Sequence, residues 1–202
     1  LAKQLGVPCY DKELLEQAAK SSGLCEEVFR SQDEKHTGSF LYSLVMDSYS
    51  ANRYSSNLYQ EMPLNQKVFL AQFEAIKELA DKGPCVIIGR CADYALEFND
   101  RHLSVFLHAG LETRIRRIAA LYDITNAKAR ERITKADKSR SSYYNYYTNK
   151  KWGAAESYNL ILDTGLLGID GSIEMIKKAV EVKEKGTAHP IYKEPMYSSV
   201  ND

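Results

Sequence analysis

The stretch PCVIIGRCADYAL, residues 84–96, decides the fold of this 202-residue chain. Its first part, CVIIG at 85–89, is a continuous apolar run after a proline, which is typical of a buried parallel strand. Gly89 ends the run, and a glycine at a strand end lets a ligand or another backbone approach closely. Arg90 follows, and its planar guanidinium can bind two oxygens of a phosphate. A strand-end arginine paired with a surface acid is the equally weighted alternative.

Three further strand-like runs flank this stretch: VPCY at 7–10, LSVFLHA at 103–109 and NLILDTG at 159–165. Helical patterns separate the runs, and Asp11 is expected to cap the first of these helices. Strands that alternate with helices predict an α/β fold, with a parallel sheet flanked by helices. Ligands of such sheets bind beyond the carboxyl ends of the strands, where Arg90 and Asp93 stand.

Positive charge is concentrated in residues 113–151, although the whole chain balances 27 basic against 27 acidic residues. The segment holds eleven Lys and Arg residues and three acids, so its net charge is +8 and that of the remainder is −8. This asymmetry predicts a bound polyanion, either a nucleotide phosphate or a nucleic acid backbone. Within the segment, Asp137 and Arg140 share a helix face, so Asp137 can orient Arg140. A surface salt bridge is the commoner explanation of such a pair.

Five aromatic residues lie at the end of the basic segment: Tyr143, Tyr144, Tyr146, Tyr147 and Trp152. Tyrosines among basic residues can stack on nucleobases, as in proteins that bind single strands. At helical spacing, however, such residues more often pack a helix against the body of a domain. We therefore expect a packing role for this cluster.

The composition argues against membrane and metal proteins. No apolar run is long enough to span a bilayer, so no membrane partner is expected. The four histidines lack the spacing of a metal site, and the four cysteines form no CxxC pair, so we predict no structural metal. Cys9 and Cys85 lie in apolar runs and are expected to be buried, reduced thiols of a cytoplasmic protein.

Three blocks, in chain order, resemble the cytidylate-kinase-like family of P-loop nucleoside monophosphate kinases. LAKQLGVPCYDKELL (1–15) is similar to the helix, strand and helix after the phosphate loop of that family. PCVIIGRCADYAL is similar to its third strand and acceptor-side turn. The block from RITKADKSR to IEMI (132–176) is similar to its lid and closing strand.

The resemblance implies a five-stranded parallel sheet with a helical acceptor-binding region at 25–62 and a lid at 111–152. These regions belong to one kinase-like domain, residues 1–186, and a polar, loosely held tail follows at 187–202. The family's central strand and glycine-rich phosphate loop have no counterpart in the sequence. We therefore expect about 15–20 further residues before Leu1, the span of a strand, a loop and the first helical turns.

The activity that the resemblance implies is ATP-dependent phosphoryl transfer with Mg²⁺. The acceptor is a nucleoside monophosphate, cytidylate by family default, or a related small phosphorylated molecule. Arg90 matches the arginine that binds the acceptor phosphate, and Asp93 is the nearest acid to the aspartate that the family places at the position of Cys91. This departure leaves the base specificity open.

The remaining implied site residues lie in the lid. Arg140 and Asp137 match its DxxR spacing and are the candidate catalytic residues. The candidate nucleotide-binding residues resemble the arginine pair at the lid's base or lie near another lid arginine: Arg116, Arg117, Arg132 and Lys135. Two other functions stay open, a nucleic-acid-binding protein that uses the basic tyrosine-rich helix and a catalytically inactive nucleotide sensor with a kinase fold. The helix-and-strand layout makes nucleic acid the less expected partner.

Overall fold

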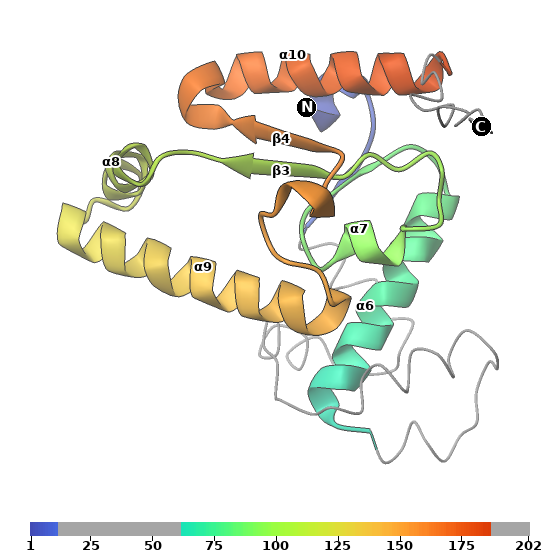
Figure 1. Ribbon diagram of the computed structural model, residues 1–202, viewed down its shortest axis with the longest axis horizontal. Helices are drawn as coiled ribbons and strands as arrows, with labels where there is room; N and C mark the ends of the chain where they lie inside the picture. Colours follow the sequence, from blue (N-terminus) through green and yellow to red (C-terminus); the bar gives the residue numbers. More distant parts are fainter. Residues whose placement is uncertain (12–61, 187–202) are drawn as a thin grey trace, which may run out of the picture.

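The computed structural model describes residues 1–11 and 62–186, and Figure 1 shows their arrangement. Strands and helices alternate along the chain, in the order α1 (Ala2–Leu5), β1 (Cys9–Tyr10), α6 (Leu64–Asp81), β2 (Val86–Ile87), α7 (Ala92–Ala95), β3 (Val105–His108), α8 (Leu111–Tyr122), α9 (Asn126–Thr148), β4 (Leu160–Asp163) and α10 (Thr164–Glu184). The predicted α/β fold, with parallel strands flanked by helices, is confirmed. The expected acceptor-binding region and the tail at 187–202 lie outside the described residues, apart from Met62.

The four described strands form two separate parallel pairs. β1 pairs with β2, with Tyr10 opposite Ile87, and β3 pairs with β4, with His108 opposite Asp163. No hydrogen bonds between described strands join the two pairs into one sheet. In Figure 1, α10 covers one side of the β3–β4 pair and α9 runs along the other.

The strands are less buried than their apolar sequences predict. Ile88, directly after β2, is 49% exposed, and Leu107 in β3 is 52% exposed. Cys9 is exposed and Cys85 is half-buried, so the prediction that both thiols are buried is wrong. The physical reason is the same in each case. A strand with a single strand neighbour keeps one open edge, and a pair of two-residue strands covers little area.

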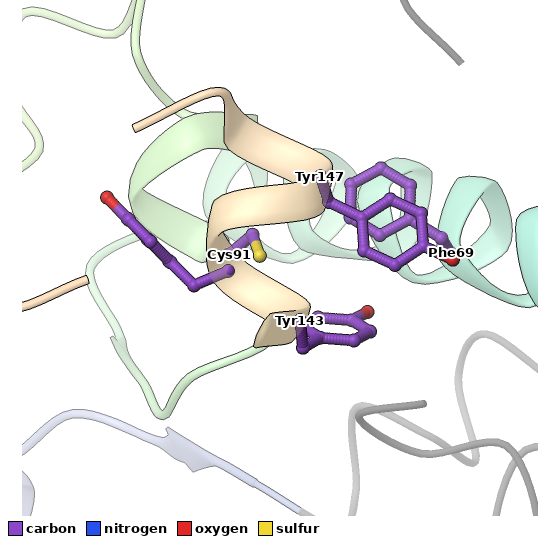
Figure 2. Packing of buried hydrophobic residues seen from close by; sticks show 5 residues of the cluster. Phe69, Cys91, Tyr143 and Tyr147 are labelled. Atoms are coloured by element: carbon purple, nitrogen blue, oxygen red, sulfur yellow. The ribbon is translucent and has the colours of Figure 1, made fainter. Parts of the chain in front are cut away.

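The largest aromatic cluster lies between α6, α7 and α9. Its fully buried members are Phe69, Cys91, Tyr143, Tyr144 and Tyr147, four of which are labelled in Figure 2. The rings of Phe69 and Tyr147 stack with centroids 4.1 Å apart and planes 4° apart. The predicted packing role of the tyrosines is therefore confirmed, and the second half of α9 belongs to the core.

The first half of α9 forms a hairpin with α8. Asp123 ends α8 in a left-handed conformation, and Thr125 begins α9 by accepting a hydrogen bond at Oγ1 from the backbone N–H of Lys128, at 3.3 Å. A small apolar cluster of Ile115, Ala129 and Ile133 joins the two helices. Leu111 and Tyr122 of α8 are 40% and 47% exposed because α9 covers only the stripe around Ile115.

Among residues 1–11 and 62–186, no helix combines the length and the hydropathy that crossing a bilayer requires.

Candidate functional site

A strained turn follows β2. Gly89, Arg90 and Cys91 all have positive φ, at 71°, 51° and 55°. The left-handed conformation costs a residue other than glycine about 1–2 kcal/mol, so the turn has to be held by its surroundings. Ala92 N–H donates to the Gly89 carbonyl at 3.0 Å, and Cys91 is buried among the tyrosines. Backbone strain that the structure maintains in this way is concentrated at functional sites of proteins.

Arg90 is fixed by two hydrogen bonds from the same nitrogen. Its Nη1 donates to Asp11 Oδ1 at 2.5 Å and to the Ile88 carbonyl at 3.1 Å. Arg90 thus forms the ion pair that was the alternative to phosphate binding. Sequence reasoning assigned Asp11 only to a helix cap. Its position directly after the first strand-like run was the available signal, because neighbouring parallel strands end at one edge of a sheet.

Asp93 connects α7 with α9. Tyr144 Oη donates a hydrogen bond to Asp93 Oδ2 at 2.6 Å. Burial raises the pKa of the Tyr144 phenol, and the hydrogen bond to Asp93 raises it further. The phenol therefore stays protonated and keeps donating to Asp93 throughout the physiological range of pH.

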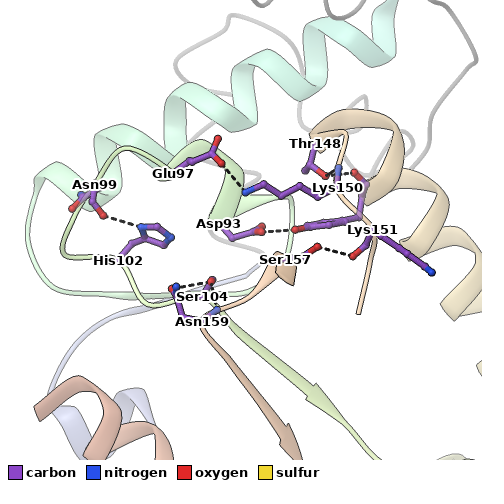
Figure 3. A network of polar contacts seen from close by, with 11 residues as sticks. Asp93, Glu97, Asn99, His102, Ser104, Thr148, Lys150, Lys151, Ser157 and Asn159 are labelled. Carbon is purple, nitrogen blue, oxygen red and sulfur yellow. Dashed lines mark hydrogen bonds and ion pairs between the residues drawn. The ribbon is translucent and has the colours of Figure 1, made fainter. Parts of the chain in front are cut away.

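A polar cavity of about 230 Å³ borders Asp93. Figure 3 shows its main contacts, an ion pair of 2.9 Å between Lys150 and Glu97 and the hydrogen bonds between Ser104 and Asn159. Ser104 precedes β3 and Asn159 precedes β4, so the cavity opens at the amino ends of these strands. Ligands of parallel sheets bind at the opposite, carboxyl ends. We therefore interpret the cavity as a structural network and not as the active site.

Asp137 pairs with a residue of the other hairpin helix. Arg114 Nη1 and Nη2 donate to Asp137 Oδ2 and Oδ1, both at 2.7 Å. This two-pronged geometry is the strongest form of an arginine–carboxylate contact. The hydrogen bonds to Asp137 raise the pKa of Arg114. Sequence reasoning proposed Arg140 as the partner and missed Arg114, because only the folded hairpin brings Arg114 next to α9.

The other basic candidates lie on the surface of the hairpin: Arg116, Arg117, Arg132, Lys135 and Arg140 are all exposed. Arg132 places its guanidinium carbon 3.8 Å from the ring centre of Tyr122, which is a cation–π contact. The hairpin therefore presents positive charge to solvent, while its aromatic residues from Tyr143 onwards face the core.

Arg140 is exposed and lies four residues before Tyr144, a separation of about 6 Å along the axis of α9. Tyr144 reaches Asp93, and Cys91 packs in the same aromatic cluster. The helix that bears Arg140 is therefore attached to the element that follows the Arg90 turn, whereas Arg116 and Arg117 lie on the other helix of the hairpin.

A nucleoside triphosphate fits the donor set of the hairpin, because most of its exposed charged groups are cationic. Magnesium in phosphoryl-transfer sites is usually held by one or two carboxylates and by the phosphates themselves. In the described ranges, no group of three or more His, Cys, Asp or Glu side chains is arranged to hold a metal ion.

Comparisons with known proteins agree with this arrangement. No curated protein sequence matches the chain at a significant level. The crystal structure of an uncharacterized protein from Eubacterium ventriosum ATCC 27560 is similar in fold, with a TM-score of 0.64 and 24% sequence identity over 89% of this chain and 87% of that chain. The family model of the cytidylate kinase-like family matches residues 1–166 and confirms the resemblance found in the sequence. The chain therefore belongs to the cytidylate kinase-like family.

Proposed function

We propose that this protein transfers the γ-phosphoryl group of ATP, bound with Mg²⁺, to a nucleoside monophosphate or a related small phosphorylated acceptor. Cytidylate is the default acceptor of the family. One observation supports the proposal, the 2.6 Å hydrogen bond from Tyr144 to Asp93, because it joins α9, which bears Arg140, to α7, which follows the Arg90 turn. Phosphoryl transfer needs aligned reactants and positive charge around the migrating group, and little covalent help from the protein.

The roles of the residues follow from their positions. Arg140 stabilises the charge that develops on the transferred group, and Asp137 is held by Arg114 and keeps the hairpin in register. Arg90 places positive charge on the acceptor side, and Asp93 anchors α9 there through Tyr144. The proposed contacts to the donor phosphates are the exposed bases of the hairpin: Arg116, Arg117, Arg132 and Lys135. Bound Mg²⁺ supplies further charge neutralisation at the phosphates.

The proposed lid comprises α8 and the first half of α9, within residues 111–152. Its second part, from Tyr143 onwards, is packed in the aromatic cluster and serves as the attachment. The proposed fold is that of a P-loop nucleoside monophosphate kinase. The parallel pairing of all four described strands, with helices between them, supports this assignment.

The test is a screen of nucleoside monophosphates with ATP and the full-length protein, with ADP formation as the readout. Arg140→Ala should lower kcat by about 10²–10⁴, by analogy with other groups that stabilise transition-state charge. Lys138→Ala is the matched control, because it removes an exposed base from the same helix and should leave kcat unchanged. Full activity of the Arg140→Ala variant would show that this arginine is not catalytic. Failure of every monophosphate would reject the acceptor class.

The structure argues against one part of the alternative function, the stacking of nucleic acid bases on the tyrosines of α9. The rings of Tyr143, Tyr144 and Tyr147 are at most 6% exposed, so they offer no surface on which bases stack. The inactive nucleotide sensor remains the second candidate. It predicts saturable ATP binding without ADP formation in the same screen.

A further inference from the structure

Asp11 and Arg90 occupy equivalent places on neighbouring strands. Tyr10, the last residue of β1, lies opposite Ile87, the last residue of β2, and Asp11 and Arg90 follow these two strand ends. The two strands are parallel, so both residues lie at the same carboxyl edge. This edge is where open parallel sheets bind their ligands. The ion pair between Asp11 and Arg90 therefore stands in the proposed acceptor site.

The two members of the pair differ in exposure. The Arg90 side chain is 10% exposed, whereas that of Asp11 is 43% exposed. A small molecule that approaches this edge therefore meets the carboxylate before the guanidinium. The two charges offset each other, so the pair attracts an anionic group less than an isolated arginine does. What the pair presents to a ligand is a hydrogen-bond acceptor.

The position of this acceptor is well defined. Arg90 cannot rotate freely, because its Nη1 is also bound to the Ile88 carbonyl and its backbone belongs to the strained turn. Holding Asp11 through such an arginine keeps the carboxylate oriented. An ordinary surface ion pair requires no left-handed turn to hold one partner.

We propose that Asp11 recognises the phosphoryl acceptor by accepting a hydrogen bond from one of its hydroxyl groups, a role that rests on the proposed function. The acceptor then carries a hydroxyl, such as a sugar hydroxyl, within reach of Asp11. An ammonium group also donates to carboxylates, but a hydroxyl is favoured here because the Arg90 guanidinium already supplies the cation that pairs with Asp11. Asp11 is thus a specificity-determining residue that faces the acceptor, and Arg90 is its positioning residue.

The test measures equilibrium binding, so that it does not depend on turnover. Cytidine 5′-monophosphate and its 2′-deoxy and 2′,3′-dideoxy analogues are titrated calorimetrically into the full-length protein and its variants. In the wild type, loss of the recognised hydroxyl should weaken binding by about 10- to 100-fold, the value of a hydrogen bond to a charged group. This dependence should vanish in Asp11→Ala. In Asp11→Asn it should shrink to about 3- to 10-fold, because a neutral hydrogen bond has about half the strength.

Asp11→Asn also separates recognition from helix capping, because Asn and Asp cap helices equally well. Asp100→Ala, which removes an exposed acid from the loop after α7, should behave as the wild type. Thermal melts show whether each variant is folded. An unchanged hydroxyl dependence in folded Asp11→Ala, or no dependence in the wild type, overturns the role of Asp11. Hydroxyl-dependent binding without ADP formation overturns the proposed function alone. Failure of all three probes to bind overturns the role of Asp11, while the monophosphate screen decides the proposed function.

Discussion

At the scale of single residues, the candidate site is defined by two arginine–carboxylate pairs that join separate elements. Arg90 joins the ends of β1 and β2 through Asp11, and Arg114 joins α8 to α9 through Asp137. In both pairs one member was a sequence-derived candidate and its partner was not. The charges that act on a ligand are therefore the net result of each pair and not of the candidate residue alone.

The pair of Arg114 and Asp137 should contribute measurably to stability. Both side chains are about 30% exposed, at 31% and 28%, so solvent screens the interaction only in part. A double-mutant cycle with Arg114→Ala and Asp137→Ala should give a coupling energy of about 1 kcal/mol in urea unfolding. Arg114→Lys should recover only part of it, because an ammonium group cannot form the two-pronged contact. A coupling energy of zero would mean that the pair is not formed in solution.

Tyr144 makes the stability of the protein sensitive to alkaline pH. The pKa of its phenol is raised in the folded state, first by burial and then by Asp93, while the unfolded phenol titrates near its ordinary value of about 10. Above pH 10 the unfolded chain therefore loses a proton that the folded chain keeps. Stability is fully present below pH 10 and falls as the pH rises, by up to about 1.4 kcal/mol per pH unit for each such tyrosine.

Tyr144→Phe should therefore reduce the slope of unfolding free energy against pH between about pH 10 and 11.5. The burial of Tyr147 also raises the pKa of its phenol, so part of the slope should remain in this variant. Tyr122→Phe, which removes an exposed phenol, should keep the wild-type slope. Equal slopes in all three proteins, measured by urea unfolding, would contradict the assignment to Tyr144.

Local signals in the sequence predicted individual residues well where the interaction partner is close along the chain. Gly6 ends α1 with a φ of 67°, and Thr125 caps α9, as expected from propensity. Partners far apart in the chain were not predicted. Arg90 is 79 residues from Asp11, and Arg114 is 23 residues from Asp137. Choosing among many acids as the partner of one arginine requires the tertiary arrangement, which residue spacing does not contain.

At the scale of elements, periodicity identified the helices and apolar runs identified the strands. The long helix after Pro63 is α6, and α10 consists of a short first part capped by Asp163 and a longer second part after a kink at Gly168. The sequence overestimated the burial of the strands. An apolar run shows that the side chains of a strand can be buried, but it does not show how many neighbouring strands cover them. The boundary of the proposed lid could not be predicted from the sequence either, because one continuous helix, α9, belongs to both the basic hairpin and the aromatic core.

At the scale of the whole molecule, the concentration of charge on the hairpin permits a decision between a nucleotide and a nucleic acid. We expect ATP binding to be saturable and a single-stranded oligonucleotide not to displace ATP at about 0.15 M salt. The reason is that Tyr143, Tyr144 and Tyr147 are buried, so these rings cannot stack on the bases of a nucleic acid. Competition measured by fluorescence anisotropy with a labelled ATP analogue checks this. Efficient displacement that weakens steeply with added salt would favour the nucleic-acid function.

Because α9 is one continuous helix, it would tilt as one rigid body about its packed end. The helix has 23 residues, so it is about 35 Å long, and its packed end is the stack of Tyr147 on Phe69. A tilt of about 10° around this point would swing the far end, at Asn126, by about 5–6 Å. Arg140 is only about 10 Å from this packed end and would shift by less than about 2 Å. In the proposed kinase, such a tilt would move the tip of the hairpin away from a bound nucleotide while Arg140 changes its position little.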